Sequence, residues 1–174
     1  MEFIWDPEKC TLLLPFSEIA IPRRVVDYAA EQGMRQKSEL HVTLLSFQNG
    51  KKLAQAVNRG ELADPAEILG LARSFSWHMD FLPEYYVLER TIPEFAINDQ
   101  VQIPRHTRRS IIQKITLPDL EPFMSELSRM TGIHFELPVA HCTLYTWSDY
   151  EPEMGSGIAL NSETDFEKYK VASL

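Results

Sequence analysis

The chain has few cysteines and no long run of apolar residues. Only Cys10 and Cys142 are present among its 174 residues, too few for a disulfide framework or a cysteine-based metal cluster, and we expect a buried thiol at Cys142. No apolar stretch approaches the roughly 20 residues that a membrane-spanning helix requires. The first ten residues, MEFIWDPEKC, are acidic where a secretory signal needs a basic flank. These absences predict a cytoplasmic protein without membrane contact.

The chain also lacks an excess of basic residues: 17 Lys and Arg stand against 25 Asp and Glu, for a net charge of −8. This charge argues against a protein that coats long DNA or RNA, which needs a basic surface. It leaves room for a small anionic substrate in a pocket. One local exception is RHTRR, residues 105–109, which we interpret as a loop. The loop is either simply solvated, His106 included, or it meets a phosphate through Arg105, Arg108 and Arg109.

Length and composition predict a single α+β domain over residues 1–174, because 44% hydrophobic and 24% charged residues are typical of a globular chain. Apolar runs and turn signals predict strands at 11–16, 39–47, 109–117 and 140–147, and a strand pair at 77–81 and 85–90. Capping and periodicity predict helices at 22–33, 51–57, 63–75 and 119–132. Residues 91–104 are expected to form a proline-containing connection. Residues 148–174 are expected to form a polar, turn-rich tail that ends in a short strand or helix.

Two parts of the chain repeat one pattern. His41 and His141 lie 100 positions apart, each on a predicted strand that follows a predicted helix. The same offset relates three further pairs: Thr43 and Thr143, Leu44 and Leu144, Pro22 and Pro122. We therefore expect two pseudo-symmetric lobes, at about 10–76 and 105–150, joined by linking strands in 77–104. Each lobe would be a mainly antiparallel sheet with helices outside, and the cleft between the lobes would carry both motif strands.

Each motif strand presents a histidine and a threonine on one face, because side chains two positions apart on a strand point the same way. A single His-x-Thr on an apolar strand is more often part of a core. The second motif changes the interpretation, since only these two of the five histidines have a hydroxyl residue two positions on. Two imidazoles and two hydroxyls around one point suit a phosphodiester. A neutral histidine takes one proton and a protonated histidine gives another, while the hydroxyls stabilise charge on phosphate oxygens.

The segments HVTLL and HCTLYT both read His, hydrophobic, Thr, hydrophobic. Over about residues 10–147 the chain resembles the two-histidine (2H) phosphoesterase superfamily, which includes cyclic nucleotide phosphodiesterases and bacterial 2′-5′ RNA ligase-like proteins. The resemblance implies that His41 and His141 act as general acid and base, in an order left open, and that Thr43 and Thr143 bind phosphate. It further implies a phosphoric diester hydrolase of RNA processing that opens 2′,3′-cyclic phosphates of nucleotides or RNA ends without a metal or other cofactor.

Other residues and functions stay open at this point. Tyr145 shares strand parity with His141, so we expect it at the cleft, bonding a phosphate, stacking on a base or filling the edge. Arg105 and Arg109 are further candidates for substrate binding.

The alternatives to hydrolysis of a 2′,3′-cyclic phosphate are 2′-5′ RNA ligation or cleavage, cleavage of a cyclic dinucleotide, and a nucleotide-binding module without turnover. A two-histidine metal site is disfavoured because strand parity brings no carboxylate beside either motif. The expected partner is a small nucleotide or RNA-end phosphate, not long DNA, and a monomer is expected.

Overall fold

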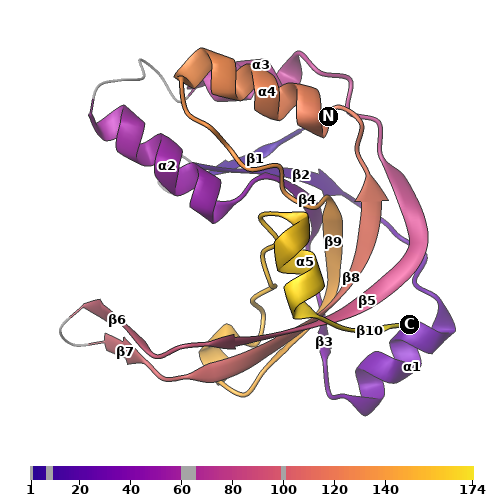
Figure 1. Ribbon diagram of the computed structural model, residues 1–174. Coiled ribbons are helices and arrows are strands. Elements are labelled where there is room, and N and C mark those ends of the chain that lie inside the picture. Colours follow the sequence, from indigo (N-terminus) through magenta and orange to yellow (C-terminus); the bar gives the residue numbers. More distant parts are fainter. Residues whose placement is uncertain (1, 7–9, 60–65, 99–100) are drawn as a thin grey trace.

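An eight-stranded antiparallel sheet forms the centre of the structure (Figure 1). The computed structural model describes residues 2–6, 10–59, 66–98 and 101–174. The strand order is β1-β2-β4-β9-β8-β5-β10, and β3 also pairs with β9. The strands are β1 (Ile4–Asp6), β2 (Thr11–Phe16), β3 (Arg35–Gln36), β4 (Leu40–Leu45), β5 (Asp80–Ile92), β8 (His106–Thr116), β9 (His141–Ser148) and β10 (Lys170–Ser173). The strands β6 (Phe95–Asn98) and β7 (Val101–Ile103) form a separate hairpin.

Five α-helices accompany the sheet in the described residues, and this confirms the predicted α+β class. They are α1 (Arg23–Glu31), α2 (Phe47–Asn58), α3 (Ala66–Arg73), α4 (Leu120–Thr131) and α5 (Glu163–Tyr169). Helix α4 ends at Gly132, whose φ of 67° is the left-handed conformation that glycine adopts at low cost. The predicted start of α3, at residues 63–65, lies outside the described residues. No helix of the described ranges is long and apolar enough to cross a bilayer.

Two hydrophobic cores lie on opposite faces of the sheet. The larger core packs buried residues of α1–α4 against the sheet and includes Ile111 of β8. The smaller core contains Phe166 of α5 and the neighbouring Ile112 of β8. Because successive side chains of a strand point to opposite faces, this division shows that α5 covers the face opposite to α1–α4. In Figure 1, α5 accordingly lies on the inner side of the curved sheet, where Phe166 packs with Leu88 of β5 and Ile112 of β8.

The segment 77–109 differs from the sequence-based expectation. The predicted strand pair is one 13-residue strand, β5, with a register shift between Phe81 and Tyr85 where Pro83 interrupts the ladder. The predicted connection contains the β6–β7 hairpin. The predicted loop at 105–109 is also wrong from His106 onward, because β8 begins there and pairs with β5. Extended pairing between distant segments overrides the local turn signals.

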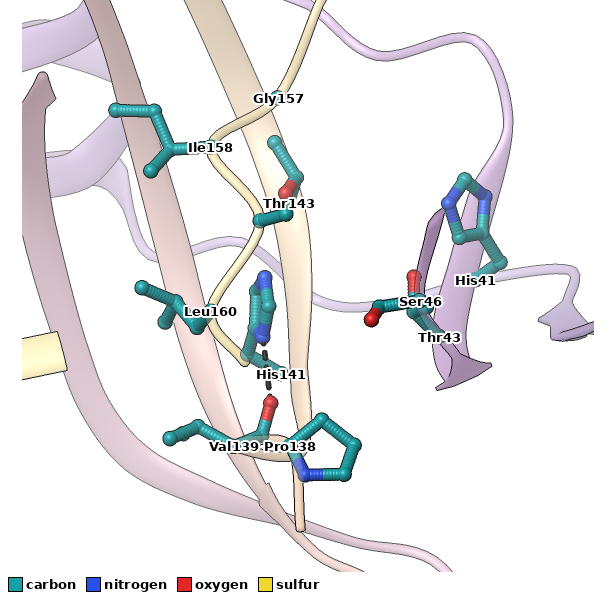
Figure 2. Close-up of a pocket in the computed structure, with 11 residues that line it drawn as sticks. His41, Thr43, Ser46, Pro138, Val139, His141, Thr143, Gly157, Ile158 and Leu160 are labelled. Carbon is teal, nitrogen blue, oxygen red and sulfur yellow. Dashed lines mark hydrogen bonds between the residues drawn. The ribbon is translucent and has the colours of Figure 1, made fainter. Parts of the chain in front are cut away.

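The C-terminal residues are integral to the sheet. After β9 the chain forms a short 3-10 helix, η1 (Glu151–Glu153), then crosses the inner face to α5 and adds β10 to the edge of β5. The tail, which we expected to end in a short strand or a helix, therefore contains one of each, α5 and β10. This route brings residues 157–160 beside the motif strands (Figure 2).

Candidate active site

The two motif strands, β4 and β9, are neighbours in the sheet. Val42 pairs with Cys142 in antiparallel register, so the two His-x-Thr motifs run past each other in opposite directions. Both paired residues are fully buried in the larger core. The alternation of strand side chains therefore places the histidines and threonines on the other face. Burial raises the pKa of Cys142 to about 12 and keeps this thiol, buried as predicted, in its protonated form.

One pocket of about 190 Å³ brings all four motif side chains together. Figure 2 shows His41 and Thr43 entering from β4, and His141 and Thr143 from β9. The remaining lining comes from Ser46 before α2, Pro138 and Val139 before β9, and the segment Gly157–Leu160. Two imidazoles and three hydroxyl residues thus surround one small volume. Hydroxyl and imidazole N–H groups are the hydrogen-bond donors that the oxygens of a tetrahedral oxyanion need.

His141 is held in one tautomer. Its Nδ1 lies 2.7 Å from the carbonyl oxygen of Val139, and because a carbonyl only accepts, Nδ1 carries a proton and donates. In the neutral ring, Nε2 is then left with its lone pair. The side chain is only 9% exposed. Burial lowers the pKa of His141, and the positive fields of His41 and Lys114 lower it further, against the opposing hydrogen bond to Val139.

His41 sits in a different environment. The ring is half-buried, and its Nδ1 is inaccessible and finds no hydrogen-bond partner among the described residues. Nε2 is therefore the nitrogen that reaches the pocket. Burial lowers the pKa of His41, Lys37 lowers it further and Glu39 opposes both. The two histidines thus differ. The ring of His141 is oriented by a backbone carbonyl, whereas His41 has two charged neighbours, Lys37 and Glu39, in the segment that leads from β3 into β4.

Ser46 is a pocket residue that the sequence-based interpretation missed. The predicted strand 39–47 runs through it, but β4 ends at Leu45 and Ser46 caps α2, accepting from the backbone N–H of Asn49 at 3.4 Å. A serine directly before a helical pattern was the available signal. Its hydroxyl lies 2.9 Å from Oδ1 of Asn161 and donates to it. The bond ties the C-terminal segment to the start of α2.

The segment Gly157–Leu160 forms one wall of the pocket, and no local sequence signal indicated it. The N–H of Ile158 donates to Oγ of Ser110 at 3.2 Å, and the carbonyl of Leu160 accepts from the N–H of Val139 at 3.3 Å. Ile158 and Leu160 also belong to the smaller core. Hydrogen bonds and packing therefore fix this wall.

Gly157 makes the closest approach of this wall to a motif residue. A Cβ on Gly157 would lie 3.2 Å from Oγ1 of Thr143, so we expect Gly157→Ala to displace that hydroxyl by a few tenths of an ångström. Small misplacements at a reacting centre are costly, and we expect kcat/KM on a phosphodiester to fall by about tenfold. Gly155→Ala is the matched control, because its added Cβ would meet nothing within 4 Å. Equal activities of the two variants would contradict a role for Thr143.

The structure places Tyr145 away from the pocket, contrary to its predicted orientation. Ile112 pairs with Thr143 but Ile111 pairs with Tyr145, so Leu144 is an extra residue and β9 has a bulge there. The bulge reverses the parity of the strand beyond it. Tyr145 is 6% exposed and packs in the larger core with Ile111. Burial raises the pKa of its hydroxyl.

The three arginines of the predicted loop are not among the described residues that line the pocket. Arg105 lies exposed before β8. Arg108 pairs with Glu153 at 2.8 Å and Arg109 with Glu89 at 2.7 Å, so carboxylates of this chain already neutralise both charges. His106, expected to be solvated, is 3% exposed. Its Nδ1 donates to the carbonyl of Pro104 at 2.8 Å, and Arg108 Nε lies 3.3 Å from its Nε2. Arg108 therefore ties the C-terminal segment to β8, Arg109 pairs with β5, and neither lines the pocket.

Within the described ranges, no three His, Cys, Asp or Glu side chains gather in a way that could hold a metal ion. No protein-family model matches the chain, and searches of curated proteins and of solved structures likewise found no match. The geometry of the pocket is therefore the basis of the functional argument.

Proposed function

We propose that this protein is a metal-independent phosphodiesterase, a phosphoric diester hydrolase that opens 2′,3′-cyclic phosphates of nucleotides or RNA ends. One observation carries the proposal: His41, Thr43, His141 and Thr143, from two strands distant in sequence, line a single pocket. The hydroxyls of Thr43 and Thr143 donate hydrogen bonds to the non-bridging phosphate oxygens. Ser46 also lines the pocket, but its hydroxyl proton is donated to Oδ1 of Asn161.

The surroundings of the two histidines favour a division of labour. We assign the general base to His141, because its Nδ1 donates to Val139 and its lowered pKa keeps Nε2 free to accept a proton from water. The Val139 carbonyl then stabilises the imidazolium that forms. We assign the general acid to His41, which protonates the leaving ribose oxygen through Nε2. The bound phosphate is anionic and, with Glu39, favours protonated His41.

The resemblance to 2H phosphoesterases remains part of the proposal, together with its two pseudo-symmetric lobes, a location in the cytoplasm and a monomeric state. The antiparallel pairing of Val42 with Cys142 supports the pseudo-symmetry, since a twofold axis between them would exchange the motifs. The pocket between β4 and β9 would then be the shared cleft.

The pH profile of kcat/KM is expected to be a bell centred below the ordinary histidine pKa of about 6.5. Activity rises as the base His141 loses its proton and falls as the acid His41 loses its proton, and both pKa values are lowered. Because Lys37 lowers the pKa of His41 and Glu39 raises it, Lys37→Met should move the alkaline limb to higher pH. Glu39→Gln should move the same limb to lower pH. Limbs that stay in place in both variants would contradict His41 as the acid.

Turnover of a panel of 2′,3′-cyclic nucleotides in the presence of a chelator tests the proposed function. We expect ring opening to a monophosphate that the chelator does not reduce. Binding of the nucleotides without turnover would instead indicate a nucleotide-binding module. Turnover that the chelator abolishes would contradict the metal-independent mechanism.

A further inference from the structure

An ion pair between Lys114 and Glu163 lies on the face of the sheet that carries the motif pocket. Lys114 of β8 is the register partner of His141 on β9, and opposite residues of neighbouring strands have their Cβ atoms about 5 Å apart. Lys114 shares strand parity with Ile112, a residue of the smaller core. Its Nζ lies 2.6 Å from Oε1 of Glu163, the first residue of α5. A pair of opposite charges is thus the cross-strand neighbour of the proposed general base.

Packing as well as charge holds the Lys114 ammonium in place. Nζ lies 3.7 Å from the centroid of the Phe166 ring, within the range of a cation–π contact. Phe166 is 2% exposed and meets Tyr86 edge-on, at 4.9 Å between ring centroids. The Lys114 side chain is 21% exposed, whereas that of Glu163 is 63% exposed. The cation is therefore fixed against the smaller core, and the carboxylate is the partner that lies toward solvent.

Few other charges surround His141. Apart from the two histidines, every described residue that lines the pocket is uncharged. His41 on β4 and Lys114 on β8 supply the positive fields that lower the pKa of His141. The His141 side chain is 9% exposed, so water screens these fields only weakly. The charge balance between Lys114 and Glu163 therefore acts on the ring directly.

We infer that Lys114 and Glu163 are positioning residues that control how readily His141 accepts a proton. The inference rests on the proposed function, in which His141 is the general base. Lys114 disfavours a second positive charge on the neighbouring ring, so Nε2 is unprotonated when water arrives. Glu163 offsets part of that cation, so the ring can still take the proton of the attacking water. Lys114 and Glu163 exchange no proton themselves.

Removal of either charge is expected to move the acid limb of the kcat/KM profile, in opposite directions. Lys114→Met removes the cation and keeps an unbranched side chain over Phe166, so the pKa of His141 rises and the acid limb moves to higher pH. Glu163→Gln leaves Lys114 without its counter-charge, so the pKa of His141 falls and the limb moves to lower pH. Lys114→Arg keeps the charge, and we expect its limb to stay near that of the wild type.

A second lysine on the same aromatic ring provides the matched control. Lys170 lies 5.1 Å from the Phe166 centroid and pairs with Glu167 at 3.4 Å, but β5 and β8 separate its strand, β10, from β9. Lys170→Met and Glu167→Gln make the same chemical changes farther from His141. We expect both to leave the acid limb in place.

Titration of the substrate-free protein gives a readout that does not depend on turnover. The ring signals of His141 in NMR spectra, assigned by their loss in His141→Asn, report its protonation directly. We expect the midpoint of this titration to rise in Lys114→Met and to fall in Glu163→Gln. Lys114→Arg and Lys170→Met should leave it unchanged.

The two readouts separate failure of the inference from failure of the proposed function. If cyclic nucleotides are turned over while the limb and the titration are the same in Lys114→Met and Lys170→Met, the inference is overturned and the proposed function stands. If no substrate is turned over, the proposed function fails and the titration decides the inference by itself. A titration midpoint that moves in the same direction in Lys114→Met and Glu163→Gln would also overturn it.

Discussion

Replacing either motif histidine is expected to lower kcat/KM on a 2′,3′-cyclic nucleotide by about 10² to 10⁴, the range that a positioned general acid or base contributes. His141→Ala removes the imidazole that the backbone carbonyl of Val139 orients through Nδ1, at 2.7 Å. His41→Ala removes the second imidazole of the pocket. Initial rates at several substrate concentrations, with a chelator present, measure both effects.

The two histidine variants need a control for the fold, because His141 is buried. His78→Ala is a matched substitution, since the His78 side chain is 79% exposed and not among the residues that line the pocket. Circular dichroism and thermal unfolding should show that all three variants are folded. His141→Asn adds a second check, because its amide can still donate to Val139 but cannot act as the base. Activity of His41→Ala and His141→Ala equal to that of His78→Ala would mean that both histidines are only structural.

Phe123→Ala is expected to lower the free energy of unfolding by about 3–5 kcal/mol, as a Phe-to-Ala change in a core does. The ring of Phe123 is fully buried in α4. It contacts Trp77 edge-on at 5.4 Å and Phe75 at 5.9 Å between centroids. The substitution loses the free energy gained by burying the ring and the aromatic contacts of the ring. It also leaves a cavity between α4 and the segment before β5.

Urea unfolding followed by tryptophan fluorescence measures this loss, since Trp77 lies beside the substituted ring. Phe47→Ala is the control: this ring is 56% exposed, and surface changes are usually worth less than about 0.5 kcal/mol. A midpoint for Phe123→Ala equal to that of Phe47→Ala would show that α4 does not anchor the larger core.

The alternation of each motif strand was readable from the sequence. The predicted burial of Cys142 is confirmed, and its strand partner Val42 is buried on the same face, because successive side chains of a strand point to opposite faces. Helices α1 and α4 were readable for the same reason, since caps and periodicity act within a few residues. The candidate pocket followed from these local rules once two equivalent strands were recognised.

The predictions for Tyr145 and the arginines failed because they used only neighbouring residues. The bulge at Leu144 reverses the parity of β9, and it is a feature of the pairing of β9 with β8, a strand distant in sequence. Arg108 and Arg109 are used by Glu153 and Glu89, partners 45 and 20 positions away in the sequence. Neither effect leaves a trace in the nearby residues, because register and ion pairing are settled between distant segments.

The sequence by itself determined that the histidine and threonine of each motif share a face of their strand, approximately where α1 and α4 begin and end, and that four groups suited to phosphate chemistry recur at a fixed offset. Only the tertiary structure decided that the C-terminal segment lines one side of the pocket and that Ser46 joins it. The physical reason is the range of the forces involved. Backbone sterics and capping bonds act over a few residues, whereas burial of Ile158 and Leu160 against β5 and β8 depends on strands brought together only by the folded chain.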